Sequence, residues 1–240
     1  MGESSEDSAA AAATAQHARR WGLLARRHPS AFLLAAQLLS LLLYPLMDQT
    51  QSGRLLFGAV ALVVVPLAVW VVNRSPAVNW IAWTLALPAI ALSFLAIVFA
   101  MPGLIVWSSM LEAVLYFYAA GSLILYMLGD HRVSADELFA AGATFTLLAW
   151  GFAYAFYACQ AWYPGSFTGL VEPERPRRWI ELLFLSFTTL SGVGSGDIMP
   201  LGAQARVLVM LQQFAGVGYI AAVVSRLIGL TILRIRLDKL

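Results

Sequence analysis

The chain carries little charge and almost no cysteine. Lys, Arg, Asp and Glu make up 12% of its 240 residues, too few for a soluble domain of this length. The single cysteine, Cys159, excludes an intrachain disulfide, and the three histidines lack the spacing of metal ligands. The basic residues form no long block, so a nucleic-acid partner is not expected. The sequence contains no nucleophile with a base partner and no phosphate-binding loop, so an enzyme is not expected.

Long apolar runs take the place of the missing charge. The chain is 60% hydrophobic, and a run of about 20 apolar residues is long enough to cross a bilayer as a helix. The sequence therefore predicts an all-α polytopic membrane protein with six transmembrane helices. The predicted spans are residues 31–47, 55–72, 80–101, 104–128, 138–162 and 204–230.

Both ends of the chain are polar. Residues 1–30 are rich in Ala and Ser and then basic, unlike a secretory signal, so we expect a cytoplasmic tail with a basic segment at the membrane surface. Residues 233–240 are predicted as a short basic cytoplasmic tail. With both termini in the cytoplasm, most of the 15 Lys and Arg residues lie on that side, as the positive-inside rule requires. We therefore expect a multi-pass protein of the cell membrane.

The segment between the fifth and sixth spans has a different composition. Residues 163–178 are rich in Pro, Glu and Arg, which predicts an exposed, solvated loop. Residues 179–190 are apolar but make only about three helical turns, too few to cross a bilayer, so we expect a re-entrant helix. Extended backbone follows, in which Gly192, Gly194 and Gly196 alternate with small residues. Such backbone persists at membrane depth only where it lines a water-filled path or is buried in protein, so this segment is the candidate site.

Residues 182–200, LLFLSFTTLSGVGSGDIMP, resemble the pore helix and selectivity filter of tetrameric potassium channels, whose usual form is TLTTVGYGDIxP. The wider pattern is similar to a bacterial family of small ion-channel proteins with a two-helix pore module and no cytoplasmic ligand domain. The resemblance implies a pore domain over residues 133–232, in a bacterial inner membrane. Four filter positions of the motif are kept: Val193, Gly194, Gly196 and Asp197.

The resemblance also implies how the site works. Backbone carbonyls replace the water around a permeant cation, and one loop cannot encircle an ion, so a homotetramer in the lipid bilayer is implied. No cofactor is expected beyond permeant monovalent cations. Asp197 would concentrate cations at the outer mouth or brace the filter through a hydrogen bond to the pore helix. The implied filter residues are Ser191, Gly192, Val193, Gly194, Ser195 and Gly196. The carbonyls implied to bind K⁺ or Na⁺ are those of Gly192, Val193, Gly194 and Ser195.

Two filter positions depart from the family pattern. Gly192 replaces a threonine whose hydroxyl lines the innermost ion site, and Ser195 replaces the tyrosine that braces the filter from outside. Selectivity depends on how many carbonyls a filter presents and how firmly they are held. We therefore expect a cation-conducting channel with weakened selectivity for potassium over sodium. The alternative is a non-conducting assembly that uses the pore fold in a structural or regulatory role.

The remaining spans supply further candidates. Residues 31–128 are expected to form a four-helix transmembrane bundle without the arginine ladder of a voltage sensor, so steep voltage gating is not expected. Glu112 has two interpretations, a gating or proton-sensing carboxyl, or a structural carboxyl hydrogen-bonded near Ser108 or Ser109. The inner helix offers cavity or gate candidates that are equally compatible with helix–helix contacts. These are Gln212, Gln213, Gly216 and Gly218.

Overall fold

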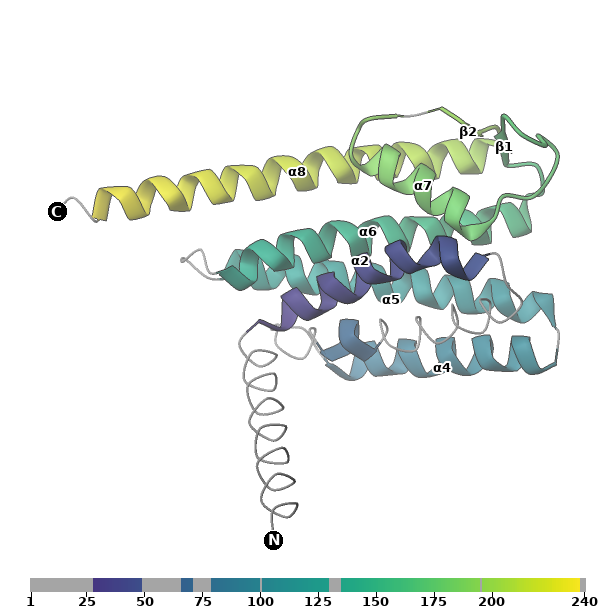
Figure 1. Cartoon of the computed structure of the whole chain (residues 1–240), viewed down its shortest axis with the longest axis horizontal. Helices are drawn as coiled ribbons and strands as arrows, with labels where there is room; N and C mark the ends of the chain where they lie inside the picture. The colour runs from purple at the N-terminus through teal and green to yellow at the C-terminus, as the bar shows by residue number, and fades with distance from the viewer. Residues whose placement is uncertain are drawn as a thin grey trace, which may run out of the picture.

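The computed structural model describes residues 28–48, 66–70, 79–99, 101–129, 135–194 and 196–237, and the fold is largely helical. Figure 1 shows the long helices running side by side, with a short helix and two short strands gathered at one end. The helices are α2 (Pro29–Asp48), α4 (Asn79–Val98), α5 (Pro102–Gly129), α6 (Ala135–Trp162), α7 (Trp179–Leu190) and α8 (Ala203–Leu237). The strands are β1 (Phe167–Gly169) and β2 (Ile198–Pro200).

Within the described residues, three helices are long and apolar enough to cross a membrane. They are Gly103–Gly129, Asp136–Trp162 and Ala203–Val223, and they correspond to the predicted fourth, fifth and sixth spans. The apolar parts of α2 and α4 are shorter, Pro29–Pro45 and Trp80–Ala96. Most of the predicted second span and the N-terminal tail lie outside the described residues. The helical fold is therefore confirmed, and the count of six spans stays a prediction.

Small residues set the packing of the long helices. Among the α4 side chains that the structure describes, the buried ones recur at helical spacing and are alanines, Ala82, Ala86, Ala89 and Ala96, which lets α4 approach α5 closely. On α6, Gly142 faces Leu34 of α2, and a Cβ at that position would lie 2.9 Å from the leucine side chain. Lipid tails are as apolar as the helix surfaces, so close van der Waals contact rather than the hydrophobic effect favours these pairs.

The start of α2 is tied to the start of α6. Pro29 opens α2, where a missing N–H and a fixed φ are tolerated. The next residue, Ser30, donates its backbone N–H to Asp136 Oδ1 at 3.2 Å and its hydroxyl to Asp136 Oδ2 at 3.0 Å. Asp136 is itself buried on α6, so a carboxylate from one helix satisfies one unpaired N–H in the first turn of another. The contact fixes the register of the N-terminal helix against α6.

An aromatic cluster joins α5 and α6 to the beginning of α7. Its ring centroids are 5.7 Å apart for Tyr116–Trp150, Tyr116–Tyr154 and Trp150–Trp179, and 5.3 Å apart for Tyr154–Trp179. Trp179 is the first residue of α7. Edge-to-face and offset-stacked arrangements of this kind favour a defined geometry. The four rings therefore fix where the short helix starts.

The Asp136 contact yields a stability prediction. Replacing Asp136 by Ala should lower the free energy of unfolding by about 1 kcal/mol, the usual cost of a lost helix cap. The effect is expected in thermal unfolding of the detergent-solubilised protein. Glu174→Ala, a change at an exposed glutamate, is the matched control and should leave the midpoint unchanged. Equal midpoints for Asp136→Ala and the unsubstituted protein would contradict the role of this carboxylate.

Candidate functional site

The short helix α7 starts and stops at defined signals. Arg178 has extended backbone, with φ −70° and ψ 156°, and its N–H donates to Glu181 Oε2 at 2.6 Å, which satisfies one unpaired group of the first turn. At the other end Gly192 follows the helix with φ 76°. A left-handed glycine just past the last turn is a common helix stop. The helix expected at residues 179–190 is therefore present with those bounds.

The glycines after α7 fold the chain back onto the helix. Gly192 and Gly194 have φ values of 76° and 62°, a region that side chains with a Cβ rarely adopt. The Gly192 N–H donates to the Thr189 carbonyl at 3.1 Å and the Gly194 N–H to the Thr188 carbonyl at 3.0 Å. The segment thus begins with a tight turn rather than the extended backbone expected from the sequence. Ser195 lies outside the described residues.

In a single chain this glycine segment lies on the surface. Val193 is 75% exposed although it is apolar. The other described members of the segment are also exposed: Ser191, Gly192, Gly194, Gly196 and Asp197. Within the described part of the chain the Asp197 carboxylate has no hydrogen-bond partner on α7, and its backbone carbonyl accepts the Leu170 N–H at 3.0 Å. The apolar Val193 side chain is therefore exposed on the surface of the single chain.

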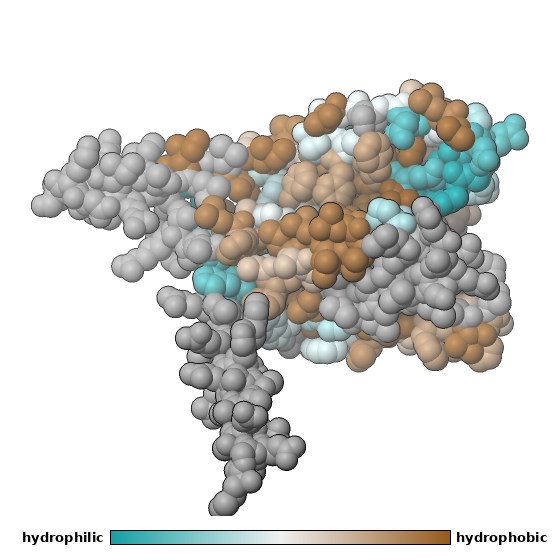
Figure 2. Space-filling view, viewed as in Figure 1, coloured by the Kyte–Doolittle hydropathy of each residue, from teal (hydrophilic) through white to brown (hydrophobic). Residues whose placement is uncertain are grey.

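Two strands anchor the far end of the segment. β2 pairs with β1 in antiparallel register, with Phe167 opposite Pro200 and Gly169 opposite Ile198. The Leu201 N–H extends the contact to the Ser166 carbonyl at 2.8 Å. The chain after the glycines is therefore tied to the loop at residues 163–178, here called the turret loop. Figure 2 shows hydrophilic residues gathered at this end of the molecule and apolar residues over the helices.

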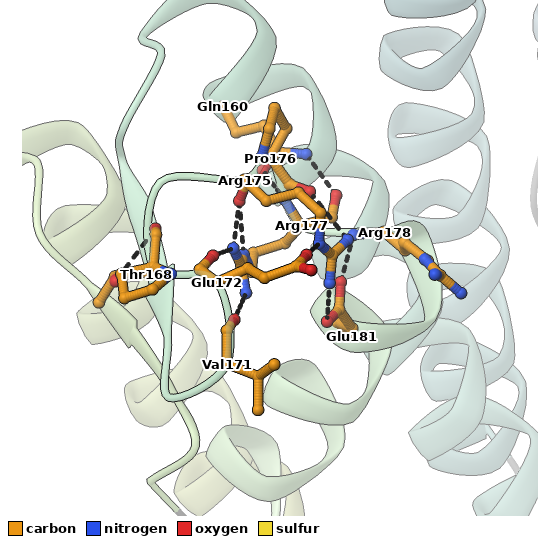
Figure 3. A network of polar contacts seen from close by, with 10 residues as sticks. Gln160, Thr168, Val171, Glu172, Arg175, Pro176, Arg177, Arg178 and Glu181 are labelled. Carbon is orange, nitrogen blue, oxygen red and sulfur yellow. Dashed lines mark hydrogen bonds and ion pairs between the residues drawn. The ribbon is translucent and has the colours of Figure 1, made fainter.

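A buried arginine organises the turret loop. Arg177 is 3% exposed, and its guanidinium donates to the carbonyls of Val171, Glu172 and Arg175 (Figure 3). Gln160 of α6 binds the Arg177 backbone on both sides, through Nε2 to the carbonyl at 2.7 Å and Oε1 to the N–H at 2.9 Å. The prediction of a solvated loop is thus wrong for Arg177. Arginines interleaved with prolines look alike in the sequence whether they face water or carbonyls.

A second arginine links the turret loop to α7. Arg175 pairs with Glu172 and with Glu181, each at 2.8 Å. Partial burial alone would raise the pKa of Glu181, but the Arg178 N–H and the Arg175 guanidinium outweigh it and hold that pKa below its ordinary value. The pKa of Arg175 is raised, chiefly by its hydrogen bond to Glu181. The ionised pair therefore fastens the turret loop to the first turn of α7.

The four inner-helix candidates occupy different environments. Gln212 is fully buried and donates from Nε2 to the Ser186 carbonyl of α7 at 3.0 Å. A Cβ on Gly216 would lie 2.9 Å from the carbonyl carbon of Leu190, so this glycine permits close approach of α7. Gln213 and Gly218 are exposed. Gln212 and Gly216 therefore make helix–helix contacts, while Gln213 and Gly218 stay candidates for a cavity or gate.

A cavity of about 290 Å³ lies beside the second half of α8. Gly218 and Tyr219 of α8 line it together with apolar residues of α5 and α6. The Tyr219 hydroxyl donates to the Ala141 carbonyl at 2.6 Å, and Arg226 lies 3.6 Å from Glu137. These contacts hold the C-terminal half of α8 against α6. Gly218 therefore lies on the α6 side of α8 and apart from the glycine segment.

Glu112 lies in a buried polar cluster away from the glycine segment. The hydroxyls of Ser93 and Ser108 each donate to Glu112 Oε1 at 3.1 Å, and the side chain of Tyr154 lies close to the carboxyl. Ser109 instead donates to Ile105 within its own helix at 2.8 Å. The expected contact with Ser108 is therefore present. Because Tyr154 also touches Trp179, the cluster connects the α4–α5 pair to the start of α7.

Two long apolar helices, α6 and α8, pack against the short helix α7, which is followed by the glycine turn. A family model described as an ion channel matches residues 113–232, from within α5 to within α8. The chain therefore belongs to this ion-channel family, whose pore is of the two-helix potassium-channel type. No curated protein and no solved structure matches the chain.

The Glu181 contacts predict a pH-dependent turret loop. A carboxyl with a lowered folded-state pKa stabilises the fold above its ordinary pKa, and this stabilisation is lost as pH falls through the lowered value. Below about pH 4, near the ordinary glutamate pKa, the unfolding midpoint should therefore begin to fall. Glu181→Gln should lower the midpoint at pH 7, and the difference should vanish at low pH. A difference that is constant from pH 7 to pH 3 would contradict this account.

Proposed function

We propose that the chain conducts monovalent cations through a filter formed by the backbone of the glycine segment. The observation that carries the proposal is the pair of left-handed glycines, Gly192 and Gly194, directly after a helix too short to cross a membrane. Carbonyls of Gly192, Val193, Gly194 and Ser195 would take the place of water around K⁺ or Na⁺. Membership of an ion-channel family supports transport rather than catalysis.

The surface of the single chain supports a homotetramer. Phe214 is 82% exposed, Val217 65% and Met210 57%, all on α8, and the glycine segment beside this helix is exposed as well. A carbonyl filter needs a ring of identical loops around one axis. Four copies would bury the exposed face of α8 and bring four glycine segments together. Asp197 would then form a ring of carboxylates at the outer mouth and concentrate cations there.

The assembly can be tested by the mass of the purified protein. In nanodiscs, mass photometry should show a species of four chains plus lipid and belt protein. Phe214→Glu, which places a charge on the exposed face of α8, should reduce that species, because a buried unpaired charge destabilises an interface by several kcal/mol, on the order of 3–5. Glu174→Ala serves as the control. A monomer as the main species of unsubstituted protein would contradict the tetramer.

The filter composition supports weak discrimination between K⁺ and Na⁺. Neither Gly192 nor Ser195 carries the side chain that the family motif has at that position. Bi-ionic reversal potentials in planar bilayers should therefore lie near zero, within about one decade of permeability ratio or ~59 mV. Gly192→Thr combined with Ser195→Tyr should move the reversal potential toward that of a K⁺-selective pore.

Three results decide among the alternatives. A reversal potential displaced well beyond ~59 mV in the direction of K⁺ preference for the unsubstituted protein would contradict weak selectivity. An unchanged reversal potential in the double variant would show that these two positions do not set selectivity. Absence of any flux from an intact tetramer would favour a non-conducting assembly with a structural or regulatory role.

We also propose that the channel is not steeply gated by voltage. The described part of α5 carries one acidic side chain, Glu112, and no arginine. Open probability should therefore change little with voltage. Both termini are proposed to lie in the cytoplasm, where Arg226 and Glu137 join α8 to α6. Glu112 keeps its two interpretations, as a gating or proton-sensing carboxyl or as a structural one.

A further inference from the structure

We propose that Gln212 and Ser186 form a positioning bridge that holds the glycine segment in place through α7 and sets its cation selectivity. The proposal deepens the conduction function proposed above and rests on it. Gln212 does not touch the permeant ion in this account. It acts through α7, whose last turn carries the segment.

The bridge joins three helices at one buried point. Gln212 of α8 is fully buried, and its Nε2 donates both to the Ser186 carbonyl at 3.0 Å and to the Ser186 hydroxyl oxygen at 2.5 Å. That hydroxyl donates in turn to the Ala149 carbonyl of α6 at 2.6 Å. Ser186 is also fully buried. The middle of α7 is thus bonded to the helix on each side of it.

The bridge lies one turn from the atoms that shape the glycine segment. The carbonyls of Thr188 and Thr189 accept the N–H groups of Gly194 and Gly192. On α8, Gly216 lies one turn beyond Gln212 and lies directly against the backbone of Leu190. Two contacts of one α8 face therefore hold both ends of the last turn of α7. A shift of α8 along α7 would move the carbonyls that fix Gly192 and Gly194.

The chemistry of the bridge favours a positioning role over simple stabilisation. Burying an amide in an apolar helix interface is costly unless its polar atoms are bonded. Gln212 Oε1 is buried without a hydrogen-bond partner among the described residues, so part of that cost is not recovered. An apolar side chain would pack here without it. The amide instead fixes how α8 is aligned on α7, because hydrogen bonds are directional and its two bonds to Ser186 define one register.

Two single variants and their combination test the bridge. Gln212→Leu removes both hydrogen bonds, Ser186→Ala removes the hydroxyl and keeps the backbone acceptor, and the double variant removes the whole bridge. Gln37→Leu in α2 and Ser122→Ala in α5 are matched controls, because Gln37 is fully buried and Ser122 is 2% exposed, both away from α7. The double variant leaves the fewest unpaired polar groups, so it is expected to assemble even where a single variant does not.

The first measurement is the relative permeability of Li⁺, Na⁺, K⁺ and Rb⁺ in bilayers. Gln212→Leu should change at least one ratio by about threefold, the effect carried by one interhelical hydrogen bond in a membrane, and Ser186→Ala by less. The double variant should show an effect smaller than the product of the two singles, because both changes break the Gln212–Ser186 contact and only the Ser186–Ala149 bond is lost independently. An unchanged series in an intact Gln212→Leu tetramer, or multiplying effects in the double variant, would overturn the proposal.

A second measurement separates the bridge from conduction itself. Hydrogen exchange of the peptide covering residues 187–198 should be about threefold faster in Gln212→Leu and unchanged in both controls. If the unsubstituted protein carries no cation flux, the proposed function fails, and this exchange rate still decides whether the bridge holds the segment. Equal exchange rates in Gln212→Leu and the unsubstituted protein would overturn the bridge whatever the flux shows.

Discussion

The hydrogen bonds around Ser186 hold the middle of the short helix α7 between α6 and α8. α7 has 12 residues, so it cannot anchor itself by crossing a bilayer. Its middle is bonded to Ala149 of α6 and Gln212 of α8, and its start is packed into the four-ring aromatic cluster. α7 sets the position of the glycine segment, because carbonyls of its last turn accept the N–H groups of Gly192 and Gly194. Disturbing the helix therefore disturbs the candidate filter.

The outer end of the segment is held by different chemistry. There the turret loop is organised by buried Arg177 and by the pairing of β1 with β2. Polar contacts of this kind suit the membrane surface, whereas small residues and a few interhelical hydrogen bonds suit the apolar depth. The segment between these two anchors carries the left-handed glycines. It is exposed in one chain, which is the arrangement expected of a surface completed by identical neighbours.

Much of the fold could be predicted from the sequence, because span length and glycine position act locally. The helix expected at residues 179–190 is α7, and the expected spans at 104–128, 138–162 and 204–230 correspond to α5, α6 and α8. The bonds that position α7 were not predicted. Gln212 is recognisable in the sequence as a polar residue in an apolar helix. Its partner is not, because Ser186 lies 26 positions earlier in the chain and on another helix. Arg177 had no signal, because burial among loop carbonyls depends on the fold of the loop.

The central claim is that four copies of the glycine segment surround a cation on one axis. Electron cryomicroscopy of the protein in nanodiscs with K⁺ tests it most directly. The account predicts a fourfold assembly with density on the axis at the level of the carbonyls of Gly192, Val193 and Gly194. An assembly without that symmetry, or a fourfold one whose glycine segments close the axis and leave no ion density, would contradict it.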